Sequence, residues 1–169
     1  LQLKQGLSDT ALENLDIARA LAPENPRAHY LFALAASDAG RHNEARRALE
    51  IALALRDDYA DAQLRLANVL MGDREFAPAA ALLAKYVAAH ADDGGARLQY
   101  ADALAKSGQP KPAEAQLRAL LDKPNLRVLA GRRLAALLDA QGRRADAEAV
   151  RKKIDPPKKQ LRELQPSRR

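Results

Sequence analysis

Histidine is the first residue type to consider for metal binding or acid–base chemistry, because its imidazole titrates near neutral pH. The chain has three, His29, His42 and His90, and they lie far apart in the sequence. Metal ligands must meet at one site, but these histidines fall at three different positions of the repeat described below. We therefore expect structural or surface histidines and no metal site.

Carboxylates gather in two short stretches of the chain, one with Asp57, Asp58 and Asp61 and the other with Asp92 and Asp93. Aspartate is favoured in turns and at helix N-caps without any catalytic role, whereas acid–base catalysis needs a pair positioned in a desolvated cleft. The chain also has no cysteine, no glycine-rich phosphate loop and no nucleophile elbow. We expect no catalytic residue, no cofactor and no enzyme activity.

The net charge of +6 is concentrated at the C-terminal end of the chain. Residues 1–150 contain 20 basic and 20 acidic residues, so the whole excess follows Val150. A nucleic-acid-binding domain more usually carries a basic stripe on its folded face, with aromatic residues or a recognition motif beside it. We therefore expect no nucleic-acid binding.

The composition indicates closely packed helices. Alanine and leucine are abundant strong helix formers, and with only 4% aromatic residues the helices must approach one another over small side chains. No apolar run reaches the roughly 20 residues that a membrane-spanning helix needs, so we expect no membrane insertion. The absence of cysteine leaves the compartment open between cytoplasm and periplasm.

Small residues recur along the chain with a period of 34 and no insertions. In frames that start at Pro26, Ala60, Gly94 and Val128, the third, eighth and twentieth residues are always alanine. Larger apolar residues keep the same register and form two stripes in each period, each on one face of a helix. Each period is therefore predicted to be a hairpin of two helices.

Glycine marks the turn inside each hairpin, because a residue after a helix C-terminus often turns left-handed and glycine does so without a Cβ penalty. The turn glycines are Gly6, Gly40, Gly108 and Gly142. One repeat has Arg74 at this position, with Gly72 two residues earlier. That repeat is predicted to have an early helix end or a less regular turn.

The period of 34, the alanine positions, the turn glycine and the proline or aspartate near the repeat end resemble the tetratricopeptide repeat (TPR). The resemblance covers about residues 1–154. The aromatic residue usual early in the first helix is replaced by His29, Gln63, Arg97 or Gly131, and the aromatic after the turn remains only as Phe76. The resemblance implies an all-α superhelix of stacked antiparallel hairpins, with the first helix of each repeat on the concave face.

The resemblance also defines the expected organisation. We expect a TPR array over residues 1–154, followed by a C-terminal segment 155–169. The array is divided into a partial repeat 1–25 and repeats 26–59, 60–93, 94–127 and 128–154. The C-terminal segment is either a basic tail or a short capping helix in which Leu161 and Leu164 cover the last hairpin, and both alternatives stay open. We expect a monomer.

The resemblance implies that the chain is a scaffold that holds a protein or peptide partner on the concave face. Alanine- and arginine-rich TPR sequences resemble bacterial ones, so the chain is expected to be part of a bacterial TPR protein in an assembly or biogenesis process. The alternative is an accessory, substrate-positioning region of a larger enzyme such as a glycosyl- or sulfotransferase.

Partner-binding residues are assigned by carrying over the family's ligand-facing positions, the second, fifth, ninth, twelfth and thirteenth of each repeat. They are Arg27, Tyr30, Leu34, Asp38, Asp61, Leu64, Asn68, Met71, Leu98, Asp102, Lys106, Arg132 and Asp139. Only Asn68 matches the residues with which some TPR domains clamp a terminal carboxylate, so that clamp is not expected. An apolar strip flanked by charges instead suits an amphipathic helix or an extended segment. Alternatively, several of these residues pack against the neighbouring hairpin or an appended helix.

Overall fold

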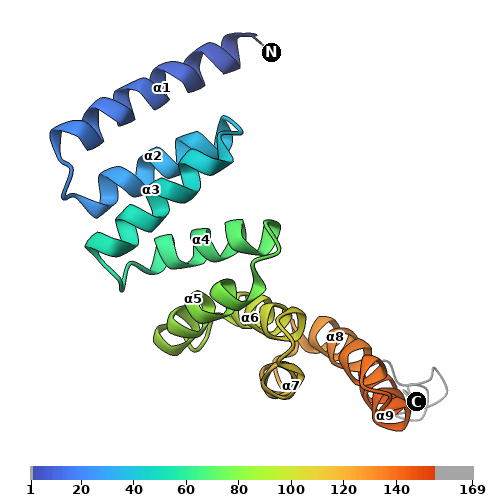
Figure 1. The fold of residues 1–169 in the computed structure, drawn as a ribbon. Helices are drawn as coiled ribbons and strands as arrows, with labels where there is room; N and C mark the ends of the chain where they lie inside the picture. Colours follow the sequence, from blue (N-terminus) through green and yellow to red (C-terminus); the bar gives the residue numbers. More distant parts are fainter. Residues whose placement is uncertain (1, 155–169) are drawn as a thin grey trace, which may run out of the picture. The chain divides into compact units, whose positions relative to one another are not determined.

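A computed structural model describes residues 2–154 of the chain, with side chains from residue 10 onward. This part consists of α-helices joined by short turns, and it contains no strand (Figure 1). The helices are α1 (Gln2–Leu21), α2 (Pro26–Asp38), α3 (His42–Leu55), α4 (Ala60–Gly72), α5 (Phe76–Ala89), α6 (Gly94–Lys106), α7 (Pro110–Ala119), α8 (Arg127–Ala140) and α9 (Arg144–Ile154). The two alternatives for segment 155–169, a basic tail or a short capping helix, concern residues that lie outside the part that the structure describes.

Capping residues define the start of the first helix in two repeats. The side chain of Asn25 accepts a hydrogen bond from the Arg27 amide at 3.0 Å, and that of Asp93 accepts one from the Ala96 amide at 2.9 Å. Asparagine and aspartate satisfy the first unpaired helix amides in this way. The helices consequently begin at Pro26 and Gly94, the residues at which the repeat frames were predicted to start.

The turn inside each complete hairpin has a residue in the left-handed backbone conformation at the same repeat position. Gly40, Gly108 and Gly142 have φ between 74° and 78°, and Arg74 adopts φ 62° at the equivalent place. The prediction of an early helix end or a less regular turn in this repeat is wrong, because α4 has 13 residues, as α2 does. Arginine accepts the left-handed conformation at a cost of about 1–2 kcal/mol.

Gly6 differs from the other predicted turn glycines because α1 continues through it. Glycine inside a helix costs only about 1 kcal/mol relative to alanine, and good helix formers such as Gln5 and Leu7 surround it.

Polar side chains replace the family's aromatic residue in three repeats, and each bonds a backbone carbonyl six residues earlier. His29 Nε2 donates to the Pro23 carbonyl at 2.8 Å, and Gln63 Nε2 donates to that of Asp57 at 2.6 Å. Arg97 Nη2 donates to the Ala91 carbonyl at 3.1 Å. These bonds attach each inter-repeat loop to the helix that follows it.

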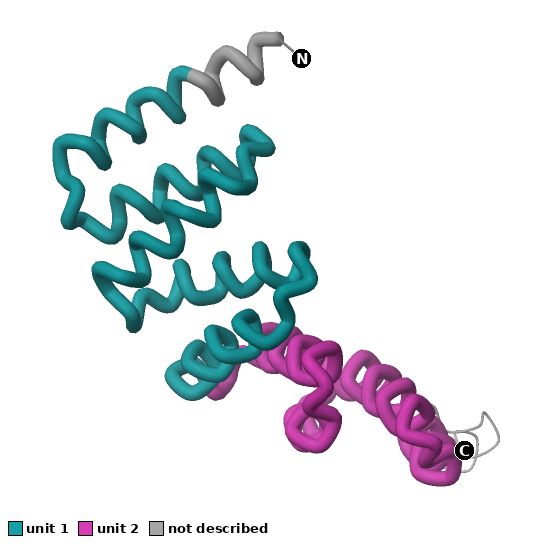
Figure 2. Tube along the Cα trace, viewed as in Figure 1, with its two compact units in different colours: residues 1–90 teal, residues 91–169 magenta. Residues whose placement is uncertain are grey.

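The helices pair in sequence order into the hairpins α2–α3, α4–α5, α6–α7 and α8–α9. The chain divides into two compact units, residues 1–90 (unit 1) and residues 91–169 (unit 2) (Figure 2). Within unit 1, α1 packs on α2 and α3 packs on α4; within unit 2, α7 packs on α8. Each unit is thus a stack of helical hairpins, and the fold is the all-α solenoid expected from the repeat.

The alanine positions predicted to allow close helix approach are buried in both units. Ala67 is 0% exposed in unit 1, and Ala135, at the same repeat position in unit 2, is 1% exposed. An alanine at a close helix crossing leaves no room for a larger side chain. The periodic alanines therefore belong to the core.

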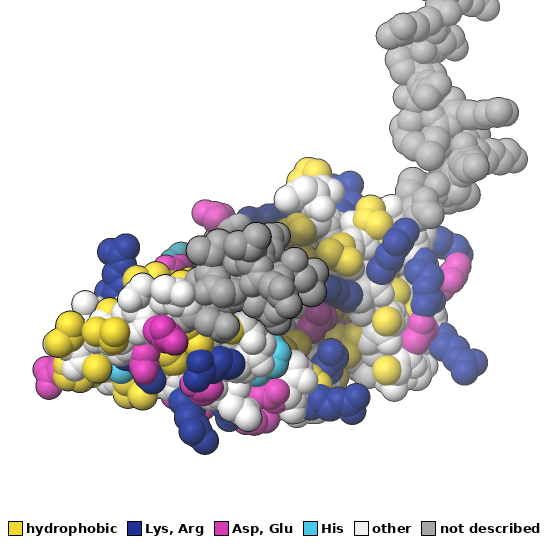
Figure 3. Space-filling model, turned by 90° about the horizontal axis from the view of Figure 1, so that it is seen from above, with side chains coloured by type: hydrophobic (Ala, Val, Ile, Leu, Met, Phe, Trp, Pro, Cys, Tyr) yellow, Lys and Arg dark blue, Asp and Glu magenta, His cyan; other side chains and the backbone are white. Residues whose placement is uncertain are grey.

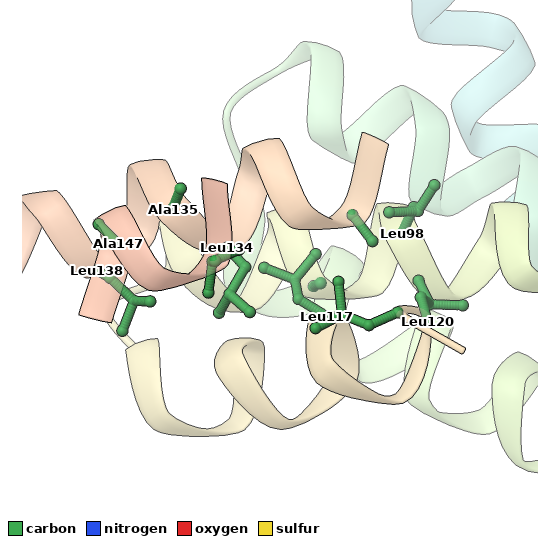
Figure 4. Close-up of a cluster of buried hydrophobic side chains, with 11 residues drawn as sticks. Leu98, Leu117, Leu120, Leu134, Ala135, Leu138 and Ala147 are labelled. Atoms are coloured by element: carbon green, nitrogen blue, oxygen red, sulfur yellow. The ribbon is translucent and has the colours of Figure 1, made fainter. Parts of the chain in front are cut away.

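The core of unit 2 contains leucines that follow a shortened helix. Helix α7 ends at Ala119, four residues before the position at which α3 and α5 end in their repeats. Leu120 and Leu121, beyond its end, are buried together with Leu98 and Leu134 in one apolar cluster (Figure 4).

Candidate functional site

Eight of the predicted partner-binding residues lie in unit 1, on α2 and α4, which are the first helices of its two complete repeats. Helix α2 carries Arg27, Tyr30, Leu34 and Asp38, and helix α4 carries Asp61, Leu64, Asn68 and Met71. The charged and amide side chains among them are exposed, whereas the tyrosine, leucines and methionine are half-buried. Solvent therefore reaches a surface of apolar side chains bordered by polar ones.

A hollow of about 210 Å³ lies between the helices of unit 1. Its walls come from α2 and α4, and its floor comes from the α2–α3 hairpin. The lining residues are Ala33, Leu34, Ser37, Ala45, Leu49, Arg65, Asn68 and Val69. The floor residues Ala33, Ala45 and Leu49 are almost fully buried, so the hollow ends on the apolar core of the unit.

Leu34 and Asn68 are the predicted residues that the hollow contains, whereas Ser37, Arg65 and Val69 were missed. Arg65 stands at the sixth position of its repeat, which is not among the ligand-facing positions carried over from the family. A comparison between repeats could have identified Arg65, because Arg133 stands at the same position two repeats later.

Tyr30 packs on a residue of the core. Its ring centroid lies 5.1 Å from that of Tyr59, and the Arg56 guanidinium lies 3.8 Å from the Tyr59 ring centroid. Burial raises the pKa of the Tyr59 phenol, and the charge of Asp61 adds to the effect. Tyr30 therefore contributes to packing as well as to the surface.

The five predicted residues of unit 2 have different surroundings. Leu98 is only 4% exposed and belongs to the core cluster (Figure 4). It cannot meet a partner at the surface, because Leu120 and Leu121 share its cluster just beyond the early end of α7. The prediction that Leu98 belongs to the binding surface is therefore wrong.

The charged residues predicted in unit 2 are largely engaged by the protein itself. Asp102 forms an ion pair with Arg133 at 2.9 Å, and Asp139 forms one with Arg151. Burial raises the pKa of Asp102, while the charges of Arg133 and Lys106 oppose that rise. Arg132 is exposed.

A second hollow, of about 270 Å³, lies between α7 and α9 in unit 2, where no site was predicted. Arg143 on its wall bonds Glu114 and Asp146, and Arg118 also pairs with Glu114. Burial favours a higher pKa for Glu114, but the hydrogen bonds from Arg143 and Arg118 prevail and lower it. Both arginines are thus engaged by Glu114, Arg118 within α7 and Arg143 from the turn before α9.

The three histidines have separate environments. His29 is buried and bonds a loop carbonyl, His42 begins α3 at the surface, and His90 stacks on the Tyr86 ring with centroids 4.4 Å apart. Among the described residues, no group of three or more His, Asp or Glu side chains could hold a metal ion.

Charges of both signs are interspersed with apolar side chains on the face that Figure 3 shows. No helix of the described part combines the length and the apolar character that crossing a membrane requires.

Comparison with known proteins agrees with the repeat. Residues 36–94 match the family model of the tetratricopeptide repeat. Among curated proteins, no sequence matches the chain.

Solved structures of TPR proteins have the same fold. The crystal structure of YrrB, described as a TPR protein with an unusual peptide-binding site, superposes with a TM-score of 0.80 at 22% identity, covering 88% of this chain and 77% of that one. MamA from Desulfovibrio magneticus RS-1 gives a TM-score of 0.76 at 19% identity, covering 97% and 91%. At these identities the similarity concerns the fold.

Proposed function

The chain contains tetratricopeptide repeats and has the fold of TPR proteins, and we propose that it is a protein-interaction scaffold whose unit 1 binds a peptide segment of a partner on the face formed by α2 and α4. The observation that carries the proposal is the hollow between these helices, with an apolar floor and a partly polar rim. Such a site buries an apolar anchor and orients it by a few polar contacts.

The size of the hollow suits one side chain of a bound segment better than a whole small-molecule ligand. Its volume of about 210 Å³ is below the roughly 300–1,000 Å³ of sites that enclose a drug-sized ligand. A side chain of a bound segment fits this space, while the half-buried Leu64 and Met71 of α4 offer further apolar surface. Anchors of this kind on a helix or an extended segment are common in peptide recognition.

Unit 1 is preferred over unit 2 because its surface residues remain available. Arg65 and Asn68 form no ion pair or side-chain hydrogen bond in the part of the chain that the structure describes. In unit 2, by contrast, Asp102 and Asp139 are paired with arginines and Leu98 is in the core.

The experiment is a selection of random display peptides on the immobilised protein, followed by affinity measurements on the enriched peptide by fluorescence anisotropy. Truncation of two apolar side chains on the face, Leu34→Ala with Leu64→Ala, should weaken binding by about tenfold or more, because central anchors can contribute about 2 kcal/mol or more. Tyr30 is left intact, since its truncation would also disturb Tyr59.

The matched control truncates two exposed apolar side chains on a second helix, Ile51→Ala with Leu55→Ala in α3. Circular dichroism should show that both variants stay helical. If no peptide is enriched, or if only the α3 variant loses affinity, the face formed by α2 and α4 is not the binding site.

The proposal extends to the cellular process in which the scaffold acts and has one alternative. We also propose that the chain belongs to a bacterial TPR protein of an assembly or biogenesis process, because its alanine- and arginine-rich repeats resemble bacterial ones. The alternative, an accessory region that positions substrate for an enzyme, predicts a catalytic domain in the same reading frame, so the flanking sequence distinguishes the two.

A further inference from the structure

Two arginines at the same repeat position have different surroundings in the two units. Arg65 and Arg133 are both the sixth residue of their repeats, and Leu34 and Asp102 are both the ninth residue of the repeat before. In unit 2 the Arg133 Nη1 atom lies 2.9 Å from the Asp102 carboxylate. In unit 1 the acid is replaced by Leu34, which lines one hollow together with Arg65.

The Arg65 guanidinium consequently has no counter-ion within the described residues. Asp61, one helical turn before Arg65 in α4, could have supplied one, but the two form no ion pair in this part of the chain. An arginine left without its carboxylate at the edge of a hollow keeps its bidentate hydrogen-bonding capacity for a ligand.

We propose that an aspartate or glutamate side chain of the bound peptide pairs with Arg65, in the place that Asp102 takes beside Arg133, while an adjacent aliphatic side chain enters the hollow. The proposal rests on the proposed function and adds the chemical class of the partner: an acidic residue next to an aliphatic one. Leu34 and Val69 supply the apolar contact, and Ser37 and Asn68 supply polar groups around the acid.

The electrostatics of unit 1 make this pairing selective. Asp38 and Asp61 are exposed on the same two helices, so they repel an acidic segment that does not reach Arg65. Repulsion of misplaced charges together with one well-placed pair gives specificity rather than high affinity.

The test uses the most enriched display peptide, synthesised with an amidated C-terminus so that all its acids are side chains. Exchange of its glutamate or aspartate for glutamine or asparagine should weaken binding to the wild-type protein by about tenfold, in the range of measured charge pairs. The Arg65→Ala variant should bind both peptides equally, which is the signature of a coupled pair in a double-mutant cycle. Arg47→Ala, an exposed arginine on α3, should keep the full preference for the acidic peptide.

A second pair of variants tests the comparison between the units. Leu34→Asp should lower affinity for the acidic peptide much more than Leu34→Asn, because the introduced carboxylate takes Arg65 for itself, as Asp102 takes Arg133. If the enriched peptides lack acidic residues, or if Arg65→Ala keeps the preference, the inference is overturned while peptide binding stands. If no peptide binds, the proposed function itself fails.

Discussion

Arg74 has a backbone conformation that glycine provides in the other complete hairpins. Its φ of 62° matches the 74° of Gly40 and the 78° of Gly108. A Cβ built at either glycine meets no atom within 4 Å, so space does not demand glycine there. Glycine is favoured there because the left-handed region is unfavourable for residues with a Cβ atom, and Arg74 is destabilised by this conformational energy.

Arg74→Gly should therefore raise the free energy of unfolding by about 1 kcal/mol, the left-handed cost less the greater chain entropy of unfolded glycine. Urea titration followed by circular dichroism measures the change. Gly40→Ala should shift stability in the opposite direction by a similar amount. An unchanged or lower stability of Arg74→Gly would mean that the arginine side chain compensates its own strain.

At the scale of the elements, charge pairs connect the second helices of adjacent repeats. Arg46 of α3 bonds Glu75, which precedes α5, with Nη2 and Oε2 3.0 Å apart. In unit 2, Glu114 of α7 bonds Arg143, which precedes α9, at 2.6 Å. Both pairs join the twenty-first position of one repeat to the sixteenth of the next, with the charges exchanged.

The pair in unit 1 predicts a pH dependence of stability. The hydrogen bond from Arg46 lowers the pKa of Glu75 below its ordinary 4.5. A carboxylate with a lowered folded pKa stabilises the protein above its unfolded pKa, and this contribution is lost as the pH falls through the folded value. The stability difference between wild type and Glu75→Gln should thus be full above pH 4.5 and vanish in more acidic solution.

Chemical denaturation at a series of pH values gives that difference directly. Glu24→Gln, which removes an exposed carboxylate without an ion pair among the described residues, should show no such trend. A difference that is independent of pH would show that the Glu75 side chain acts through packing rather than charge.

The period located these elements because each alanine position marks a helix crossing, and crossings repeat with the hairpin. Helices α2, α4 and α6 begin at Pro26, Ala60 and Gly94, the first residues of their frames, and α8 begins one residue before its frame. The period could not separate Leu64 from Leu98, which share one repeat position. Leu98 belongs to the core of unit 2, where α7 ends early and the leucines beyond it are buried in the same cluster.

The binding surface was less predictable for a related reason. Family positions indicate which side chains face outward, but they do not say which charges the protein satisfies itself. The difference between Arg65 and Arg133 depends on a residue of the preceding repeat, Leu34 or Asp102. Such a difference emerges only when side chains of two hairpins are compared in space.

At the scale of the whole molecule, the division into two units has an energetic consequence. In stacked repeats each hairpin contacts only its neighbours, so stability is approximately a sum of repeat and interface terms. Ala67 in unit 1 and Ala135 in unit 2 are equally buried members of one alanine position. The same substitution at the two sites should therefore loosen different parts of the chain.

Ala67→Leu and Ala135→Leu should each lower stability by about 1–3 kcal/mol, because a larger side chain forces closely packed helices apart. Hydrogen exchange followed by mass spectrometry locates the loss. Ala67→Leu should speed amide exchange in α2–α5 and leave α8–α9 protected, and Ala135→Leu should do the reverse, since local opening follows contiguous cooperative segments. Ala60→Leu, at a half-buried repeat junction, should change exchange least. Equal loss of protection in all hairpins from either substitution would contradict the nearest-neighbour account, because the two units would then open as one cooperative block.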